Sequence, residues 1–102
     1  MTSAILSPAA RRDIIEIGRW ISNDNPAAAR AFQKSIINAA EIIGERPNIG
    51  RQRPEITSKE VHFFILRGFP YTIVYKADRQ PPYIIRVLHS AHDLPDILRD
   101  ND

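Results

Sequence analysis

Apolar residues recur every three or four positions in the first half of the chain, which is the period of an amphipathic α-helix. The first such segment follows Ser7 and Pro8, a pair typical of a helix N-cap and first helical position. It is expected to end near Ser22. Its apolar stripe consists of Ala10, Ile14, Ile17 and Ile21.

A second helix is predicted to follow almost at once. Asn25 and Pro26 repeat the signal of a cap and a first helical position, and Gly44 and Pro47 are expected to stop the helix. Its apolar stripe consists of Ala29, Phe32, Ile36, Ala39 and Ile43. Because only residues 23–25 separate the two helices, they should form an antiparallel hairpin whose apolar faces cover a shared surface.

The second half of the chain changes to short runs rich in β-branched and aromatic residues, which predicts strands. Three runs are expected to form an antiparallel meander: VHFFILR (61–67), YTIVYK (71–76) and YIIRVLH (83–89). The leading SAIL (3–6) is a candidate fourth strand, because it is apolar and stops at the helix cap. The segment RPNIGRQRPEITSKE (46–60) contains two prolines and a glycine and is predicted to be a surface loop.

The resulting order is strand, helix, helix, strand, strand, strand. It predicts an α+β fold with a helical hairpin packed on one face of an antiparallel sheet. At 102 residues, 43% of them hydrophobic, the chain has the size of a single domain spanning residues 1–102. A short C-terminal helix is expected after Asp93 as its cap, with Leu94, Ile97 and Leu98 closing over the core.

Arginine predominates among the cations, although the formal net charge is only +2. Eleven of the fourteen cationic residues are arginine. A guanidinium pairs with carboxylates and phosphates better than an ammonium does, so an acidic protein or a nucleic acid is a plausible partner beside the alternative of ordinary surface arginine. The chain has no cysteine and no apolar segment near the roughly 20 residues of a membrane span, so we expect a cytoplasmic protein without a membrane partner.

The last predicted strand runs into the segment IIRVLHSAHD (84–93), which holds two of the three histidines. No two glycines are close enough to form a phosphate-binding loop, so no nucleotide cofactor is expected. His89 and His92 have no further His or Cys nearby, so no metal site is expected. Ser90 is adjacent to His89, and adjacent strand residues point to opposite faces, which argues against a nucleophile–base pair.

RNA cleavage is harder to exclude, because it needs only a general base, a general acid and cations around the phosphate. Arg67, Arg86, His89, His92 and Tyr75 could supply these groups. Strand alternation places residues 85, 87 and 89 on one face and residues 84, 86 and 88 on the other, so Arg86 and His89 converge only if a bulge re-aims one of them. A strand-end histidine and a salt-bridged arginine are the favoured interpretation from the residues alone.

Several sequence segments, taken in chain order, resemble those of a known family. LSPAARRDIIEIGRWISNDNPAAARAF matches a helical hairpin with a central NP, PNIGRQRPEI an arginine loop, and FPYTIVYKAD with IIRVLHSAHDLPDIL the sheet and tail. Together they resemble the ParE-type toxins of the RelE/ParE superfamily, the toxin half of bacterial type II toxin–antitoxin pairs. Members of this branch usually carry Val-Leu-His, then two residues of which at least one is small, and then an Arg-Asp pair. Here His92 stands where arginine is usual, before Asp93.

The resemblance implies a cognate antitoxin as partner. Such a ParD-like antitoxin dimerises and binds operator DNA through a ribbon-helix-helix N-terminal part, and it wraps the toxin with an often acidic C-terminal segment. The toxin would then contact operator DNA only through the antitoxin. The antitoxin-binding candidates are the arginines on the exposed sides of the hairpin: Arg11, Arg12, Arg19 and Arg30.

The resemblance also implies one of two targets. ParE-type members inhibit DNA gyrase by binding and stabilising its cleaved-DNA complex, whereas RelE-type members cut mRNA in the ribosome and typically carry lysines as well as arginines on the loop and middle strands. The loop of this chain holds Arg51 and Arg53 but no lysine between residues 46 and 58. A gyrase inhibitor without catalytic residues is therefore the expected function.

In that interpretation Arg86, His89 and His92 form a target-binding rim where the sheet meets the tail. Arg67 is a further target-binding candidate. A RelE-type mRNA endonuclease and a non-toxic, antitoxin-bound co-repressor are the alternatives.

Overall fold

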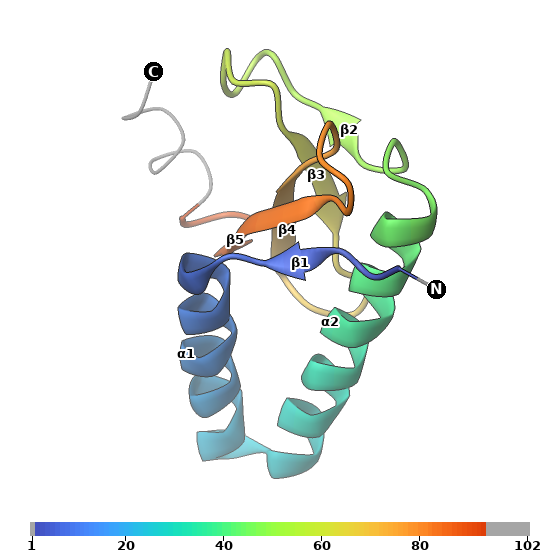
Figure 1. Cartoon of the computed structure of the whole chain (residues 1–102). Coiled ribbons are helices and arrows are strands. Elements are labelled where there is room, and N and C mark those ends of the chain that lie inside the picture. Colours follow the sequence, from blue (N-terminus) through green and yellow to red (C-terminus); the bar gives the residue numbers. More distant parts are fainter. Residues whose placement is uncertain (1, 94–102) are drawn as a thin grey trace.

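The predicted order of elements is confirmed in the computed structural model, which describes residues 2–93 and adds one short strand. The elements are β1 (Ile5–Leu6), α1 (Pro8–Asp24), α2 (Pro26–Glu45), β2 (Arg51–Gln52), β3 (His62–Ile65), β4 (Tyr71–Lys76) and β5 (Tyr83–His89). Figure 1 shows the two helices as a hairpin beside the sheet. The helix predicted after Asp93 lies outside the described residues.

Both helices begin at the predicted caps. The Ser7 Oγ accepts a hydrogen bond from the Ala10 N–H at 3.0 Å, and the Asn25 Oδ1 accepts one from the Ala28 N–H at 3.1 Å. Each cap satisfies a backbone donor that has no partner within its own helix. No helix in residues 2–93 is long and apolar enough to cross a membrane.

The end of the first helix was predicted two residues too early. α1 continues two residues past Ser22, because Asn25 serves both as the C-cap of α1 and as the N-cap of α2. α2 ends at Glu45, between Gly44 and Pro47, as predicted. A Cβ at position 44 would lie 2.0 Å from the Thr2 carbonyl oxygen, so glycine is needed for the close approach of the N-terminal segment.

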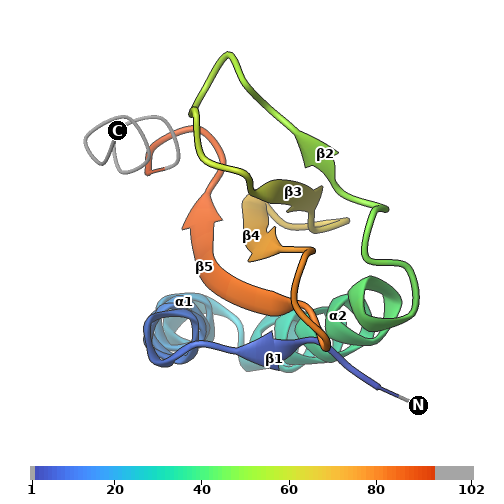
Figure 2. The same ribbon diagram turned by 45° about the horizontal axis from the view of Figure 1, so that its top comes forward.

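The sheet is mixed rather than wholly antiparallel as predicted. Its strand order is β1-β5-β4-β3-β2, and every neighbouring pair is antiparallel except β1 with β5. Figure 2 shows β1 beside β5 and between the ends of the helices. The predicted loop also contributes a strand, because Arg51 and Gln52 pair with Phe63 and His62 of β3.

The two faces of the sheet carry separate apolar clusters. The larger cluster, between the sheet and the helices, includes Ala10, Phe32, Ile36, Ala39, Ile43, Leu66, Tyr71, Ile73, Tyr75, Ile84 and Val87. The smaller cluster, on the opposite face, consists of Val61, Phe63, Val74 and Leu88 with Ile56 and Ile85 packed against it. Both helical stripes therefore face the sheet as predicted, while Ile56 of the 46–60 segment helps to cover the far face.

A β-bulge in β5 overturns the predicted alternation of its side chains. Residues 84 and 86 pair with the consecutive β4 residues Tyr75 and Val74, so Ile85 is extra. As a result Ile84 and Val87 both belong to the helix-facing cluster, although simple alternation predicted opposite faces for them. β1 pairs only with Tyr83 and Ile84, so the residues of β5 from the bulge onward lie at the edge of the sheet.

Candidate functional site

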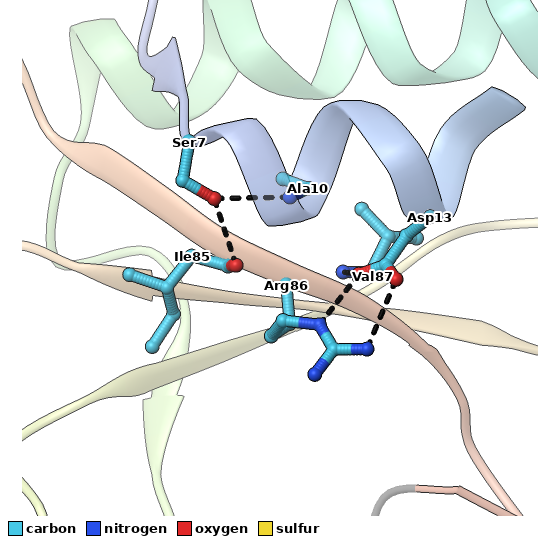
Figure 3. A network of polar contacts seen from close by, with 6 residues as sticks. All are labelled: Ser7, Ala10, Asp13, Ile85, Arg86 and Val87. Atoms are coloured by element: carbon cyan, nitrogen blue, oxygen red, sulfur yellow. Dashed lines mark hydrogen bonds and ion pairs between the residues drawn. The ribbon is translucent and has the colours of Figure 1, made fainter.

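The carboxylate of Asp13 joins α1 to the edge of β5 (Figure 3). Its Oδ2 accepts hydrogen bonds from the Arg86 Nε at 2.8 Å and from the Val87 backbone N–H at 2.9 Å, and its Oδ1 accepts one from the Arg86 Nη2 at 3.0 Å. The Ser7 Oγ donates to the Ile85 carbonyl at 2.9 Å on the same edge. These side chains satisfy edge groups of β5 beyond its short pairing with β1.

Arg86 is therefore one half of an ion pair. The side chain of Asp13 is 12% exposed and that of Arg86 is 33% exposed, so the pair is partly shielded from water. The hydrogen bonds that Arg86 donates to Asp13 are the main cause that raises the pKa of Arg86; burial opposes this rise, and the charges of Asp13, Asp93 and Glu16 add to it. The carboxylate of Asp13 therefore offsets much of the positive field that the Arg86 guanidinium would otherwise present to a partner.

His89, the last residue of β5, caps the turn that follows it. Its Nδ1 accepts hydrogen bonds from the backbone N–H groups of Ala91 and His92, both at 3.2 Å, and its carbonyl accepts one from Asp93 at 3.1 Å. A ring nitrogen that accepts N–H bonds carries no proton, so the neutral ring holds its proton on Nε2. In this tautomer His89 can donate a hydrogen bond outward but has no free lone pair for a general base.

His89 and His92 lie together in a hollow between α1 and the end of β5. Their ring centroids are 4.4 Å apart, and His89 packs edge-on against Tyr71 at 5.5 Å. The hollow, with a volume of about 420 Å³, is called the histidine hollow and is lined by Glu16, Ile17, Trp20, Tyr71, His89, His92 and Asp93. Trp20 is 74% exposed, which is unusual for so large an aromatic side chain.

The other predicted cations do not join the histidines. Arg67 is exposed and lines a separate hollow between α2 and the segment from β3 to the following turn. Arg53 forms an ion pair with Glu55 at 2.6 Å, and Arg51 is exposed on β2. Of the four target-binding candidates, His89 and His92 line the same hollow, and Arg67 lines a different one.

Tyr75, a candidate for RNA cleavage, is a buried structural residue. Its side chain is fully buried, and its hydroxyl donates to the Pro47 carbonyl at 2.6 Å and accepts from the Gly50 N–H at 2.9 Å. Burial raises its pKa, and the hydrogen bond from Gly50 opposes this rise. Tyr75 therefore anchors the arginine loop to the sheet.

A second hollow lies between the two helices and differs in charge. This hollow, called the hairpin groove, is lined by Ile14, Ile15, Gly18, Arg19, Ser22, Pro26, Ala29, Arg30 and Gln33. All four predicted antitoxin-binding arginines are exposed, and two of them, Arg19 and Arg30, line this groove. Within residues 2–93 none of the four forms an ion pair.

Sequence reasoning missed Asp13, Glu16, Trp20 and Tyr71. The first three recur at spacings of three and four, so they form a polar and aromatic stripe beside the apolar stripe of α1. That spacing was the available signal. No group of three His, Cys, Asp or Glu side chains within the described part of the chain could hold a metal ion.

The chain matches a family model described as the ParE toxin of the type II toxin-antitoxin system, parDE, over residues 4–94. Because this match spans nearly the whole chain, the protein belongs to this family of type II toxin–antitoxin toxins. Toxin RelE3 of Caulobacter vibrioides is 30% identical over 90 residues, which are 88% of this chain and 96% of that toxin. Y4kP of Sinorhizobium fredii is 32% identical over 89 residues, 87% of this chain and 88% of its own length.

The fold is similar to that of a chain in the chromosomal ParDE toxin–antitoxin system from P. aeruginosa. The TM-score is 0.71 at 21% sequence identity, and the match covers 87% of this chain and 96% of that chain. This likeness confirms the RelE/ParE-like α+β fold.

Proposed function

We propose that this toxin inhibits DNA gyrase by binding it and stabilising its cleaved-DNA complex, and that a cognate ParD-like antitoxin neutralises it in the cytoplasm. The observation that carries the proposal is that three of the five candidate catalytic groups are engaged in structural contacts. The Tyr75 hydroxyl holds the arginine loop, Arg86 pairs with Asp13, and the Nδ1 of His89 caps a turn. RNA cleavage would need a free base, a free acid and unpaired cations around one phosphate.

The two remaining candidates do not supply that arrangement. Arg67 and His92 line different hollows, so they do not act on one phosphate. The same residues are suited to binding, because an exposed Trp20 beside histidine and tyrosine rings is a typical centre for a protein contact. The histidine hollow is therefore the proposed surface for the target.

The antitoxin is proposed to bind at the hairpin groove. The guanidinium groups of Arg19 and Arg30 are exposed and form no ion pair within residues 2–93. They fit the carboxylates of an acidic antitoxin segment, and Ile14 and Ile15 provide apolar contact beside them. Arg11 and Arg12 extend the same positive charge toward the start of α1. An antitoxin held here would leave its N-terminal part free to bind operator DNA.

Two assays on the purified toxin, freed of antitoxin, test the proposal. One measures supercoiling and DNA cleavage by gyrase, and the other measures the integrity of mRNA in a reconstituted translation reaction. We expect cleaved DNA to accumulate while mRNA remains intact. Codon-positioned cuts in mRNA with unaffected gyrase would contradict the proposal and favour the RelE-type alternative.

A further inference from the structure

The histidine hollow is negatively charged, although the chain as a whole is cationic. Two carboxylates, Glu16 and Asp93, lie among the described residues that line it, and no arginine or lysine of residues 2–93 does. Arg86 is a cation near the hollow, and it is paired with Asp13. Within residues 2–93 neither Glu16 nor Asp93 forms an ion pair, so both charges are available to a partner.

Two cations of α1 lie within one turn of Glu16 and do not cancel this charge. Arg12 is four residues before Glu16 and Arg19 is three residues after it, and neither pairs with it. Arg19 lines the hairpin groove instead.

Electrostatic effects on neighbouring groups indicate that the two carboxylates act on the same region. The pKa of Tyr71 is raised first by burial and then by the charge of Asp93. Both Asp93 and Glu16 contribute to the raised pKa of Arg86. Because electrostatic interactions fall with distance, both carboxylates must lie near the junction of α1 and β5.

The same hollow is walled by aromatic rings. Tyr71 and His89 are in edge contact at 5.5 Å, His89 and His92 are 4.4 Å apart, and the largely exposed Trp20 lines the hollow with them. The faces of tryptophan and tyrosine rings attract cations through their quadrupoles. Carboxylates and aromatic rings around one hollow form a complementary site for a flat cation.

We infer that the histidine hollow binds an arginine side chain presented by a protein partner. A guanidinium can stack on an aromatic ring and donate paired hydrogen bonds to a carboxylate, whereas a lysine ammonium does not offer the flat face. A phosphate would be repelled by Glu16 and Asp93, so the hollow does not fit a nucleic-acid backbone. The inference rests on the proposed function only in taking the partner to be the cellular target; the chemistry of the site is independent of that assignment.

Trp20, the only tryptophan of the chain, provides a direct reporter of binding. Its fluorescence would be followed during titration with three blocked tripeptides of sequence Gly-X-Gly, in which X is arginine, citrulline or glutamate. Citrulline has the shape of arginine without its charge. We expect a saturable change with the arginine peptide and binding weaker by at least about fivefold with the citrulline peptide.

Charge variants locate the response in the hollow. The double variant Glu16→Gln/Asp93→Asn is expected to weaken binding of the arginine peptide by on the order of tenfold. The matched control Glu41→Gln/Asp78→Asn removes the same charge at two exposed positions outside the hollow and is expected to change nothing. An equal loss in both double variants would overturn the inference.

The variant His92→Arg tests whether the hollow prefers a positively charged ligand. It places a guanidinium among the lining residues, so it should compete with the arginine peptide and weaken its binding. Stronger binding of the glutamate peptide than of the arginine peptide by the native chain, or no Trp20 response to any of the three, would overturn the inference. Because these titrations contain no gyrase, their failure is distinct from a failure of gyrase inhibition.

Discussion

The hairpin groove and the histidine hollow share one helix but are opposite in chemistry. Ile15 and Arg19 of α1 line the groove, whereas Glu16 and Trp20, each the next residue along, line the hollow. A step of one residue turns a side chain by about 100° around a helix, so neighbouring residues in sequence serve different surfaces. α1 thus presents arginine to one side and carboxylate with an aromatic ring to the other.

This difference explains why the net charge says little about partners. The formal charge of +2 adds together a cationic groove, an anionic hollow and paired charges such as those of Asp13 and Arg86. In the proposed function, a small toxin that binds both an acidic antitoxin segment and a target gains specificity when the two surfaces attract opposite charges. Variants on either side of α1 can therefore test whether the two charged surfaces act separately.

The largest expected effect comes from breaking the link between α1 and β5. Asp13→Ala should lower the free energy of unfolding by about 2–3 kcal/mol, because the Val87 N–H and the Arg86 guanidinium lose their shared acceptor in a partly buried place. Asp13→Asn keeps one acceptor oxygen and should cost about half as much. Urea denaturation followed by circular dichroism measures both, and equal stability of Asp13→Ala and the native chain would contradict the assigned role.

Tyr75→Phe changes stability without touching either surface. The Pro47 carbonyl and the Gly50 N–H lose their buried partner, which should cost about 1–3 kcal/mol of unfolding free energy. At temperatures where the variant is folded, its affinities for antitoxin and for the arginine peptide should equal those of the native chain. This variant therefore controls for effects that arise only from lower stability, and altered affinity in it would show that the arginine loop is coupled to a binding surface.

Removing charge from the groove should separate the two surfaces. Arg19→Gln/Arg30→Gln is expected to weaken binding of the antitoxin's acidic segment by roughly 1–2 kcal/mol, with a loss that shrinks at high salt. Isothermal titration at two salt concentrations measures this. Arg46→Gln/Arg79→Gln, two exposed arginines outside the groove, is the matched control and should bind normally.

Two amide substitutions separate the two functions of the His89 ring, which are acceptance of the turn hydrogen bonds by Nδ1 and outward donation by Nε2. Asparagine places an oxygen near the position of Nδ1 and can keep the turn, whereas glutamine reaches the position of Nε2 and gives up the turn acceptor. His89→Gln should therefore cost about 0.5–1 kcal/mol of stability and His89→Asn less. Urea denaturation measures this difference in stability. Binding of the target should be weakened more by His89→Asn than by His89→Gln.

The smallest effect is a pH dependence of stability above neutrality. The folded-state pKa values of Tyr75 and Tyr71 are raised, so above the unfolded value of about 10 the unfolded chain loses protons that the folded chain keeps. The contribution of each tyrosine is full below about pH 10 and is lost as the pH rises through the folded pKa. Stability should fall between about pH 9 and about pH 11, and Tyr75→Phe should show a smaller fall.

The elements were predictable from sequence wherever a local pattern specifies them. The caps at Ser7 and Asn25 and the helical stripes are local signals, and the structure confirms them. The parallel pairing of β1 with β5 was not predictable, because no local signal links Ile5 to Tyr83. The bulge at Ile85 likewise depends on contacts with α1 that are distant in sequence.

The candidate site was predicted in part for the same reason. The close spacing of His89 and His92 in sequence indicated that their side chains lie together, and their rings are in contact in the structure. Arg86 lies near the histidine hollow but is paired by Asp13 from a distant helix, and Arg67 lines another hollow. Their roles in target binding stay predictions. Trp20 and Glu16 join the histidines only through the packing of α1 on β5.

The most direct test of the account is gyrase-dependent DNA cleavage measured against increasing antitoxin for three proteins: the native toxin, Glu16→Gln/Asp93→Asn and Arg19→Gln/Arg30→Gln. We predict that the hollow variant traps little cleaved DNA but still binds antitoxin with native affinity. The groove variant should trap cleaved DNA as well as the native toxin does and should need more antitoxin to be neutralised. Equal effects of the two variants on both steps, or no trapped DNA with the native toxin, would contradict the division of one helix between two partners.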